Sequence, residues 1–211
     1  FMLESAEASK HWGRYTFIGF DPILEVTCQN GRLTVNGGTA VTSETGHPGT
    51  MIRSILAENK APRLAGMPPF SGGLVGYFAY DYIKYSEPTL ALSADDEENF
   101  KDVDLMLFDK VIAFDNYRQK ILLIANIRTE ELVTEYHKGV MELDNLVRLI
   151  TRGEMAEPAP LRLKSDFRLL FDQEQYCRMV ETGKEYIREG DIFQVVLSNR
   201  LDADIEGSIF D

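Results

Sequence analysis

The sequence has little of what several classes of protein depend on. Its 211 residues include two cysteines, Cys28 and Cys177, far apart and outside any CxxC or Cys/His pattern, so we predict neither a disulfide framework nor a zinc site. Only 22 lysines and arginines stand against 34 acidic residues, and the formal charge of -12 disfavours nucleic acid and anionic membrane surfaces as partners. Apolar runs fall far short of the ~20 residues of a membrane helix, and no basic stretch precedes one. We therefore expect a cytoplasmic protein without a membrane span.

Common catalytic motifs are missing as well. The three histidines, His11, His47 and His137, show no HxxxH or HExxH spacing, and no serine lies in a GxSxG context, so metallohydrolase and serine-hydrolase chemistry have no support. The glycines of residues 72–76 lack both the Gly-Lys-Ser/Thr and the GxGxxG patterns. We interpret them as sites of close backbone approach in a strand. The acidic run at residues 95–98 is interpreted as a solvated loop.

What the chain does contain is a pattern of short strands and three helices. Asn30-Gly31 between apolar runs predicts a type I′ hairpin, and helical spacing is seen at residues 51–59 and from Thr129 to Gly153. Asp172 with Gln175 predicts a capping box for a third helix, which stops at Gly190. Strands are predicted at residues 13–20, 23–27, 32–35, 105–114, 120–127 and 192–201. These elements predict an α+β fold, with antiparallel sheets packed on each other and flanking helices.

Proline and the loss of periodicity divide the chain. Residues 154–167 carry two prolines and predict a linker, with an N-terminal domain at residues 1–153 and the start of a second domain at residues 168–211. One helix and one strand cannot close a core, so we expect the chain to end inside this second domain. The chain opens with Phe1 where an initiator methionine would stand, which suggests a fragment of a longer protein.

One group of polar residues near the N-terminus has the composition of an amino-acid site. A carboxylate and a hydroxyl, Glu4 and Ser5, are followed closely by Arg14, and together they could hold the ammonium and carboxylate of a zwitterion. The residues alone favour a plainer interpretation, a surface ion pair and a turn serine. Gln194 lies between Phe193 and Val195, where an amide either satisfies a core hydrogen bond or points into a pocket.

Four blocks of sequence, taken in order, resemble one family. These are MLESAEASKHWGRYTFIGFDP, PPFSGGLVGYFAYDYIKYSEP, DLMLFDKVIAFDN and EYIREGDIFQVVLSNRL. They are similar to the component I family of chorismate-utilising enzymes, and the first resembles the N-terminal signature of anthranilate synthase component I. The resemblance runs from Phe1 to about Leu201, essentially the whole chain.

The resemblance implies a reaction and its partners. Such enzymes convert chorismate, with ammonia from a glutamine amidotransferase subunit (component II), into anthranilate and pyruvate, using Mg²⁺, and they are inhibited by L-tryptophan. Family members are longer, and their magnesium ligands and catalytic histidine lie in the C-terminal half. The resemblance therefore implies no catalytic or metal-binding residue in this chain, which by itself should be inactive.

The resemblance also gives two groups of residues a role. The LES triplet matches Leu3, Glu4 and Ser5 to the family's tryptophan site, with Arg14 aligned less closely, and the other wall of that site would come from the missing half. Gln194 matches the position at which water-adding relatives have a lysine general base. A neutral amide there favours ammonia as the nucleophile.

Two other functions remain open from the sequence. Aminodeoxychorismate synthase component I, an enzyme of the folate pathway, shares the ammonia chemistry and much of the N-terminal domain. A non-catalytic module that binds tryptophan or docks the amidotransferase is the third possibility.

Overall fold

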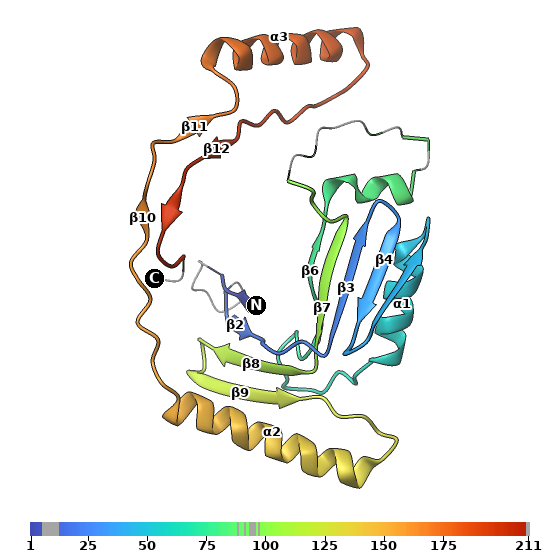
Figure 1. Ribbon diagram of the computed structural model, residues 1–211, viewed down its shortest axis with the longest axis vertical. Coiled ribbons are helices and arrows are strands. Elements are labelled where there is room, and N and C mark those ends of the chain that lie inside the picture. The colour runs from blue at the N-terminus through green and yellow to red at the C-terminus, as the bar shows by residue number, and fades with distance from the viewer. Residues whose placement is uncertain (6–12, 88, 91, 93–95, 97, 210–211) are drawn as a thin grey trace. The chain divides into compact units, whose positions relative to one another are not determined.

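The computed structural model describes residues 1–5, 13–87, 89–90, 92, 96 and 98–209. His11, Asp95 and Glu97 lie outside the described residues, and so do the interpretations placed on them. The chain divides into two compact units, Phe1–Gly153 and Glu154–Asp211, whose elements are labelled in Figure 1. No helix among the described residues is long and apolar enough to cross a membrane.

Unit 1 contains a five-stranded antiparallel sheet. Its strands are β3 (Leu24–Gln29), β4 (Arg32–Asn36), β5 (Ala40–Glu44), β6 (Gly73–Phe78) and β7 (Val103–Phe108), in the spatial order β5-β4-β3-β7-β6. The predicted β3–β4 hairpin is confirmed, because Asn30 and Gly31 both have positive φ angles, 49° and 82°, and Gln29 pairs with Arg32. Strand β5 was not predicted, whereas β6 contains the glycines that were interpreted as lying in a strand.

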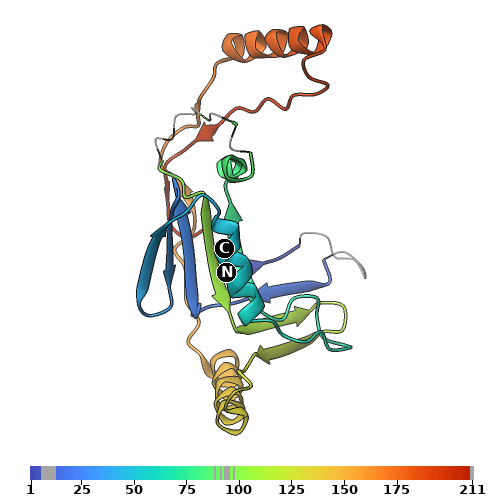
Figure 2. The same cartoon turned by 90° about the vertical axis from the view of Figure 1, so that its right-hand side faces the viewer.

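Helix α1 (Pro48–Glu58) covers one face of this sheet, as Figure 2 shows. Ile52 and Ile55 project from the helix into the first core, which the strands complete with Val26, Cys28, Leu33, Val103, Leu105 and Leu107. The short amphipathic helix predicted at residues 51–59 is confirmed. It begins three residues earlier because Pro48 suits the first helical turn.

The glycines of residues 72–76 serve the sheet, as predicted. A Cβ added to Gly76 would lie 1.9 Å from the Asp104 carbonyl oxygen of the neighbouring strand, and its φ of 155° is open mainly to glycine. After β6 the chain forms a 3₁₀ helix, η1 (Tyr80–Tyr85).

The second sheet of unit 1 has four antiparallel strands in the order β1-β2-β8-β9. They are β1 (Met2–Leu3), β2 (Tyr15–Ile18), β8 (Lys110–Asp115) and β9 (Lys120–Ala125). A hairpin joined through residues 115–119 is confirmed as β8–β9, but only β8 is largely buried, since Ile124 is the one buried residue of β9. Residues 105–114 are not one strand. The chain passes at Asp109 from β7 in the five-stranded sheet to β8 in the other, and the charged pair Asp109-Lys110, which separates two apolar runs, marks this change.

Helix α2 (Leu132–Arg152) packs along β9. It begins after Glu131 and not at Thr129, and it ends at Gly153 as predicted. The apolar residues whose spacing predicts this helix lie mostly on its exposed side; Val133 and Tyr136, for example, are 72% and 60% exposed. The helix instead turns Gly139 and Leu146 inward, because a Cβ at Gly139 would lie only 2.7 Å from Ile127 Cγ2 and its absence allows close approach.

Unit 2 is built from α3 (Gln173–Glu189) and two small two-stranded sheets. One pairs β10 (Arg162–Leu163) with β13 (Ile205–Glu206), and the other pairs β11 (Arg168–Leu169) with β12 (Leu201–Asp202). The capping box of α3 is confirmed, since the Gln175 N–H donates to Asp172 Oδ1 at 2.8 Å and the Asp172 N–H donates to Gln175 Oε1 at 2.9 Å.

The strand predicted at residues 192–201 is wrong for residues 192–200. No described strand pairs with this segment, and a β-strand requires a hydrogen-bonded neighbour. Side chains hold it against the rest of unit 2: Tyr176 OH donates to the Leu197 carbonyl at 3.2 Å, and the Asn199 side chain exchanges two hydrogen bonds with the Phe171 backbone.

Candidate functional site

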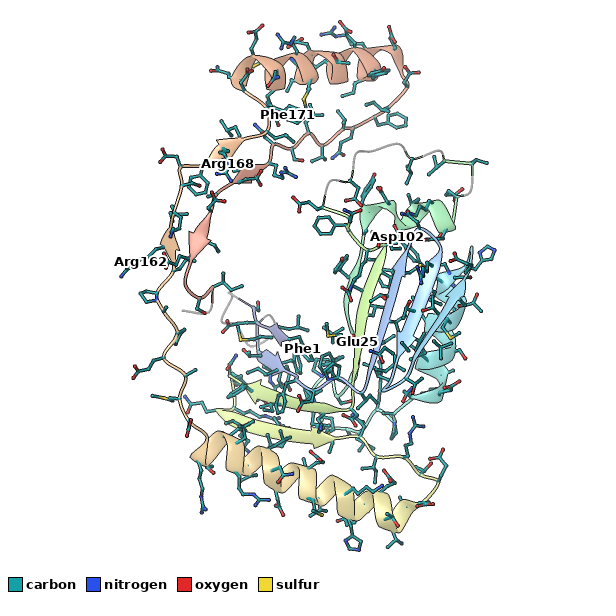
Figure 3. All side chains as sticks on the ribbon, in the orientation of Figure 1. Phe1, Glu25, Asp102, Arg162, Arg168 and Phe171 are labelled. Atoms are coloured by element: carbon teal, nitrogen blue, oxygen red, sulfur yellow. The ribbon has the colours of Figure 1, made fainter. Side chains whose placement is uncertain are left out.

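The LES triplet lies at an edge of the four-stranded sheet of unit 1. Leu3 is in β1 and pairs with Phe17 of β2, while Glu4 and Ser5 follow it and are exposed. Phe1, labelled in Figure 3, anchors this edge: its backbone nitrogen donates to the Gly19 carbonyl at 2.6 Å, its carbonyl accepts from the Gly19 N–H at 3.1 Å, and its ring packs on Phe108 at 4.6 Å between centroids. A carboxylate and a hydroxyl therefore stand in solvent beside an anchored strand.

Arg14 stands just before β2 and is held by Asp115 at the end of β8. Its Nε donates to Asp115 Oδ1 at 2.9 Å and its Nη2 to Oδ2 at 2.5 Å, a two-point contact with a carboxylate whose side chain is only 3% exposed. The hydrogen bond from Arg14 lowers the pKa of Asp115 to about 2. The guanidinium also lies over the Tyr15 and Tyr117 rings, 4.7 and 5.8 Å from their centroids.

The predicted site residues are thus only partly brought together. Leu3, Glu4 and Ser5 form one exposed segment, and the antiparallel pairing of β1 with β2 directs this segment toward the start of β2, where Arg14 stands. Gln194 belongs to unit 2. It is exposed within the irregular segment at residues 192–200, not in the middle of a strand.

An open apolar groove lies near Gln194 but does not include it. The groove has a volume of about 520 Å³ and runs between α3 and the segment that follows this helix. Its apolar lining comprises Phe171, Met179, Tyr186, Ile192, Val195 and Leu197.

A buried polar cluster at one end of the five-stranded sheet was missed from the sequence. Asp102, labelled in Figure 3, is 4% exposed and accepts hydrogen bonds from Tyr85 OH and the Asn30 N–H, both at 2.7 Å, while Lys84 Nζ lies 2.7 Å from its other oxygen. Tyr85 OH in turn accepts from the Gly31 N–H at 2.7 Å. The cluster thereby fastens η1 and the β3–β4 turn to the start of β7.

The charges of this cluster are mutually stabilised. Burial raises the pKa of the Asp102 carboxyl, but the hydrogen bonds from Lys84 and Tyr85 outweigh it and the pKa is lowered. Burial, together with the Cys28 and Asp102 contacts, raises the pKa of Tyr85. The Asp102 carboxylate, the Lys84 ammonium and the Tyr85 hydroxyl each have partners within the protein, which indicates a structural role.

Asp109 lies outside this cluster, at the point where the chain passes between the two sheets, and its carboxylate is not fully hydrogen-bonded. Its Oδ1 is buried and has no hydrogen-bond partner among the described residues. Burial raises the pKa of its carboxyl, although neighbouring Lys110 acts in the opposite direction. Its backbone carbonyl is well used, accepting from the Asn126 N–H at 2.8 Å and from Asn126 Nδ2 at 3.0 Å.

A metal centre is not found in the part of the chain that the structure describes. No group of three or more His, Cys, Asp or Glu residues there could hold an ion.

Comparison with known proteins gives one consistent family. The chain matches the model of the chorismate binding enzymes over residues 1–211. It is 35% identical to anthranilate synthase component 1 of Acinetobacter calcoaceticus, over 98% of this chain and 42% of that protein, and 32% identical to that of Saccharomyces cerevisiae, over 95% and 39%. The crystal structure of anthranilate synthase component I from Streptococcus pneumoniae TIGR4 superposes with a TM-score of 0.69 at 26% identity, covering 99% of this chain and 45% of that one. The chain spans less than half the length of these relatives.

Proposed function

Because the chain belongs to the chorismate-binding enzyme family, we propose that it is part of an anthranilate synthase component I. The observation that carries the proposal is the similarity of 95–98% of its length to component 1 proteins from a bacterium and a yeast. The whole protein would convert chorismate and ammonia into anthranilate, pyruvate and water. A glutamine amidotransferase subunit would supply the ammonia, and Mg²⁺ would be bound by residues outside this chain.

The direct test is product formation by the full-length protein that carries this chain. Given chorismate, ammonia and Mg²⁺, it should release anthranilate, which is followed by its fluorescence. Aminodeoxychorismate without anthranilate would identify the folate-pathway enzyme instead. The 211-residue chain, assayed alongside, should form neither product, and turnover by the chain alone would contradict the proposal that its residues are not catalytic.

Feedback inhibition by L-tryptophan is proposed for the exposed segment of Leu3, Glu4 and Ser5. The Ser5 hydroxyl and the Glu4 carboxylate are both free to face a ligand, since both residues are exposed. Ser5→Phe should block the site by its bulk and relieve inhibition. Ser43→Phe, the same change on exposed strand β5, is the matched control and should remain inhibited. Equal inhibition of the Ser5→Phe and Ser43→Phe enzymes would remove Ser5 from the site.

Gln194 is proposed to face the chorismate pocket of the whole protein. An amide cannot remove a proton from water, so its presence favours ammonia as the nucleophile. Gln194→Lys should lower ammonia-dependent turnover and open a water-adding side reaction. The control is Gln173→Lys, the same change at the exposed first residue of α3. Unchanged ammonia kinetics in Gln194→Lys would place Gln194 outside the pocket.

A further inference from the structure

We propose that Arg14 is a positioning residue, which holds the Leu3–Ser5 segment in place through Asp115 and does not itself bind the amino-acid ligand. This inference rests on the proposed tryptophan site in unit 1. It differs from the role that the family resemblance implies, in which Arg14 contacts the tryptophan, and it agrees with the ion pair that the residues alone favour.

The Nε–Nη2 edge of the Arg14 guanidinium is already occupied. Its Nε and Nη2 donate to the two oxygens of Asp115. A ligand carboxylate that bound Arg14 side-on at two points would need this same edge of the guanidinium. Asp115 Oδ1 accepts in addition from the Arg118 N–H at 3.0 Å, so the carboxylate is fixed from a second side. The Tyr15 and Tyr117 rings then restrict the guanidinium further.

The ion pair acts on the LES segment through strand β2. The Arg14 carbonyl accepts from the Asn116 N–H at 2.8 Å, and Asn116 Nδ2 donates to Thr16 Oγ1 at 3.2 Å. Together with the ion pair, these contacts tie the start of β2 to the turn after β8. Strand β2 is an inner strand of the sheet, paired with β8 on one side and with the edge strand β1 on the other. The position of β2 therefore determines the direction in which Leu3, Glu4 and Ser5 run.

The two possible roles of Arg14 make opposite predictions for Asp115. Its carboxylate is 3% exposed and cannot contact a ligand. If Arg14 acts by position, removing the charge of Asp115 harms tryptophan binding as much as removing Arg14. If Arg14 were a ligand, removing that charge would free the guanidinium and leave binding equal or tighter.

The experiment is tryptophan calorimetry on the full-length protein that carries this chain. Arg14→Gln and Asp115→Asn should each raise the Kd by a similar factor of about ten, a loss of about 1.4 kcal/mol of binding free energy. The double change Arg14→Asp with Asp115→Arg should recover most of the affinity, because it restores the ion pair with the charges exchanged. Arg14→Lys, which keeps the charge but loses the two-point contact, should fall between these variants and serves where Arg14→Gln does not fold.

The result that would overturn the inference is a loss of binding in Arg14→Gln and in the double variant, with Asp115→Asn unaffected. A second readout separates this outcome from failure of the proposed site itself. Amide hydrogen exchange should accelerate in β1 when either partner is removed, and the exchanged pair should restore the slow rate. If the unaltered protein bound no tryptophan, the feedback site would be wrong, and β1 exchange rates that neither substitution changed would refute the positioning role.

Discussion

Removing the Tyr85 hydroxyl from the buried polar cluster should lower the free energy of unfolding of unit 1 by a large fraction. In Tyr85→Phe, Asp102 loses a donor at 2.7 Å and the Gly31 N–H loses its acceptor, also at 2.7 Å. A hydrogen bond to an ionised group contributes about 1.5–3 kcal/mol and a neutral one about 0.5–1.5 kcal/mol. Tyr85 is partly exposed, so water replaces some of the loss, and we expect unfolding to become easier by about 2–3 kcal/mol.

The assay is urea denaturation followed by circular dichroism, with thermal melting as a second measure. A loss of this size in a domain of this length should lower Tm by about 5–10 °C. Tyr82→Phe is the matched control, since Tyr82 lies on the same 3₁₀ helix and packs on the same core but its hydroxyl makes no hydrogen bond among the described residues. If the two variants lost the same free energy, or Tyr85→Phe lost less than about 0.5 kcal/mol, the cluster would not have the role derived for it.

Three further predictions follow from single residues of unit 1. Gly76→Ala should destabilise unit 1 by about 1–3 kcal/mol more than Gly38→Ala. Both glycines have positive φ angles, but only Gly76 faces the Asp104 carbonyl, and the difference is measured as a difference in urea midpoint between the two variants. Asp115 has a pKa of about 2 in the folded protein, below its value in the unfolded chain, so the stability it contributes is present above pH ~4 and is lost as the pH falls toward 2. In a measurement of Tm against pH, Asp115→Asn should therefore reduce the fall of Tm between pH ~4 and ~2. Asp109 has the opposite shift, so its ionised form costs stability at neutral pH; Asp109→Asn should raise the urea midpoint at pH 7, and a gain that did not shrink on acidification would contradict this cause.

Local chemistry explains which parts of the fold were predictable from the sequence. The Asn30-Gly31 turn and the Asp172–Gln175 capping box are decided by neighbours within a few residues, and both are confirmed. The division at Asp109 was missed because the charged pair Asp109-Lys110 between two apolar runs was included in a single strand, and a pair of charges does not by itself show that the two runs join different sheets. The face of α2 was missed because a glycine, not the apolar stripe, sets how closely the helix approaches β9.

The same reasoning applies to the candidate site. The LES triplet was found because its three residues are adjacent in the sequence. Asp115, which holds Arg14, lies 101 residues further along the chain, and Tyr85 lies 17 residues from Asp102. Contacts between residues this far apart leave no pattern in a single sequence. Residue type alone favoured an ion pair for Arg14, which the contact with Asp115 confirms, but it could not name the partner; the ligand role came from the family resemblance.

The single residue between β7 and β8 also limits how the chain length of this protein can vary. Asp109 is the entire connection from Phe108 in one sheet to Lys110 in the other, and both neighbours are in ladder contacts. One added residue would shift every later side chain of β8 to the opposite face or force a bulge into a buried strand. Insertions and deletions among related chains should therefore be absent at this junction, and grafted peptides or labels are better placed elsewhere in unit 1.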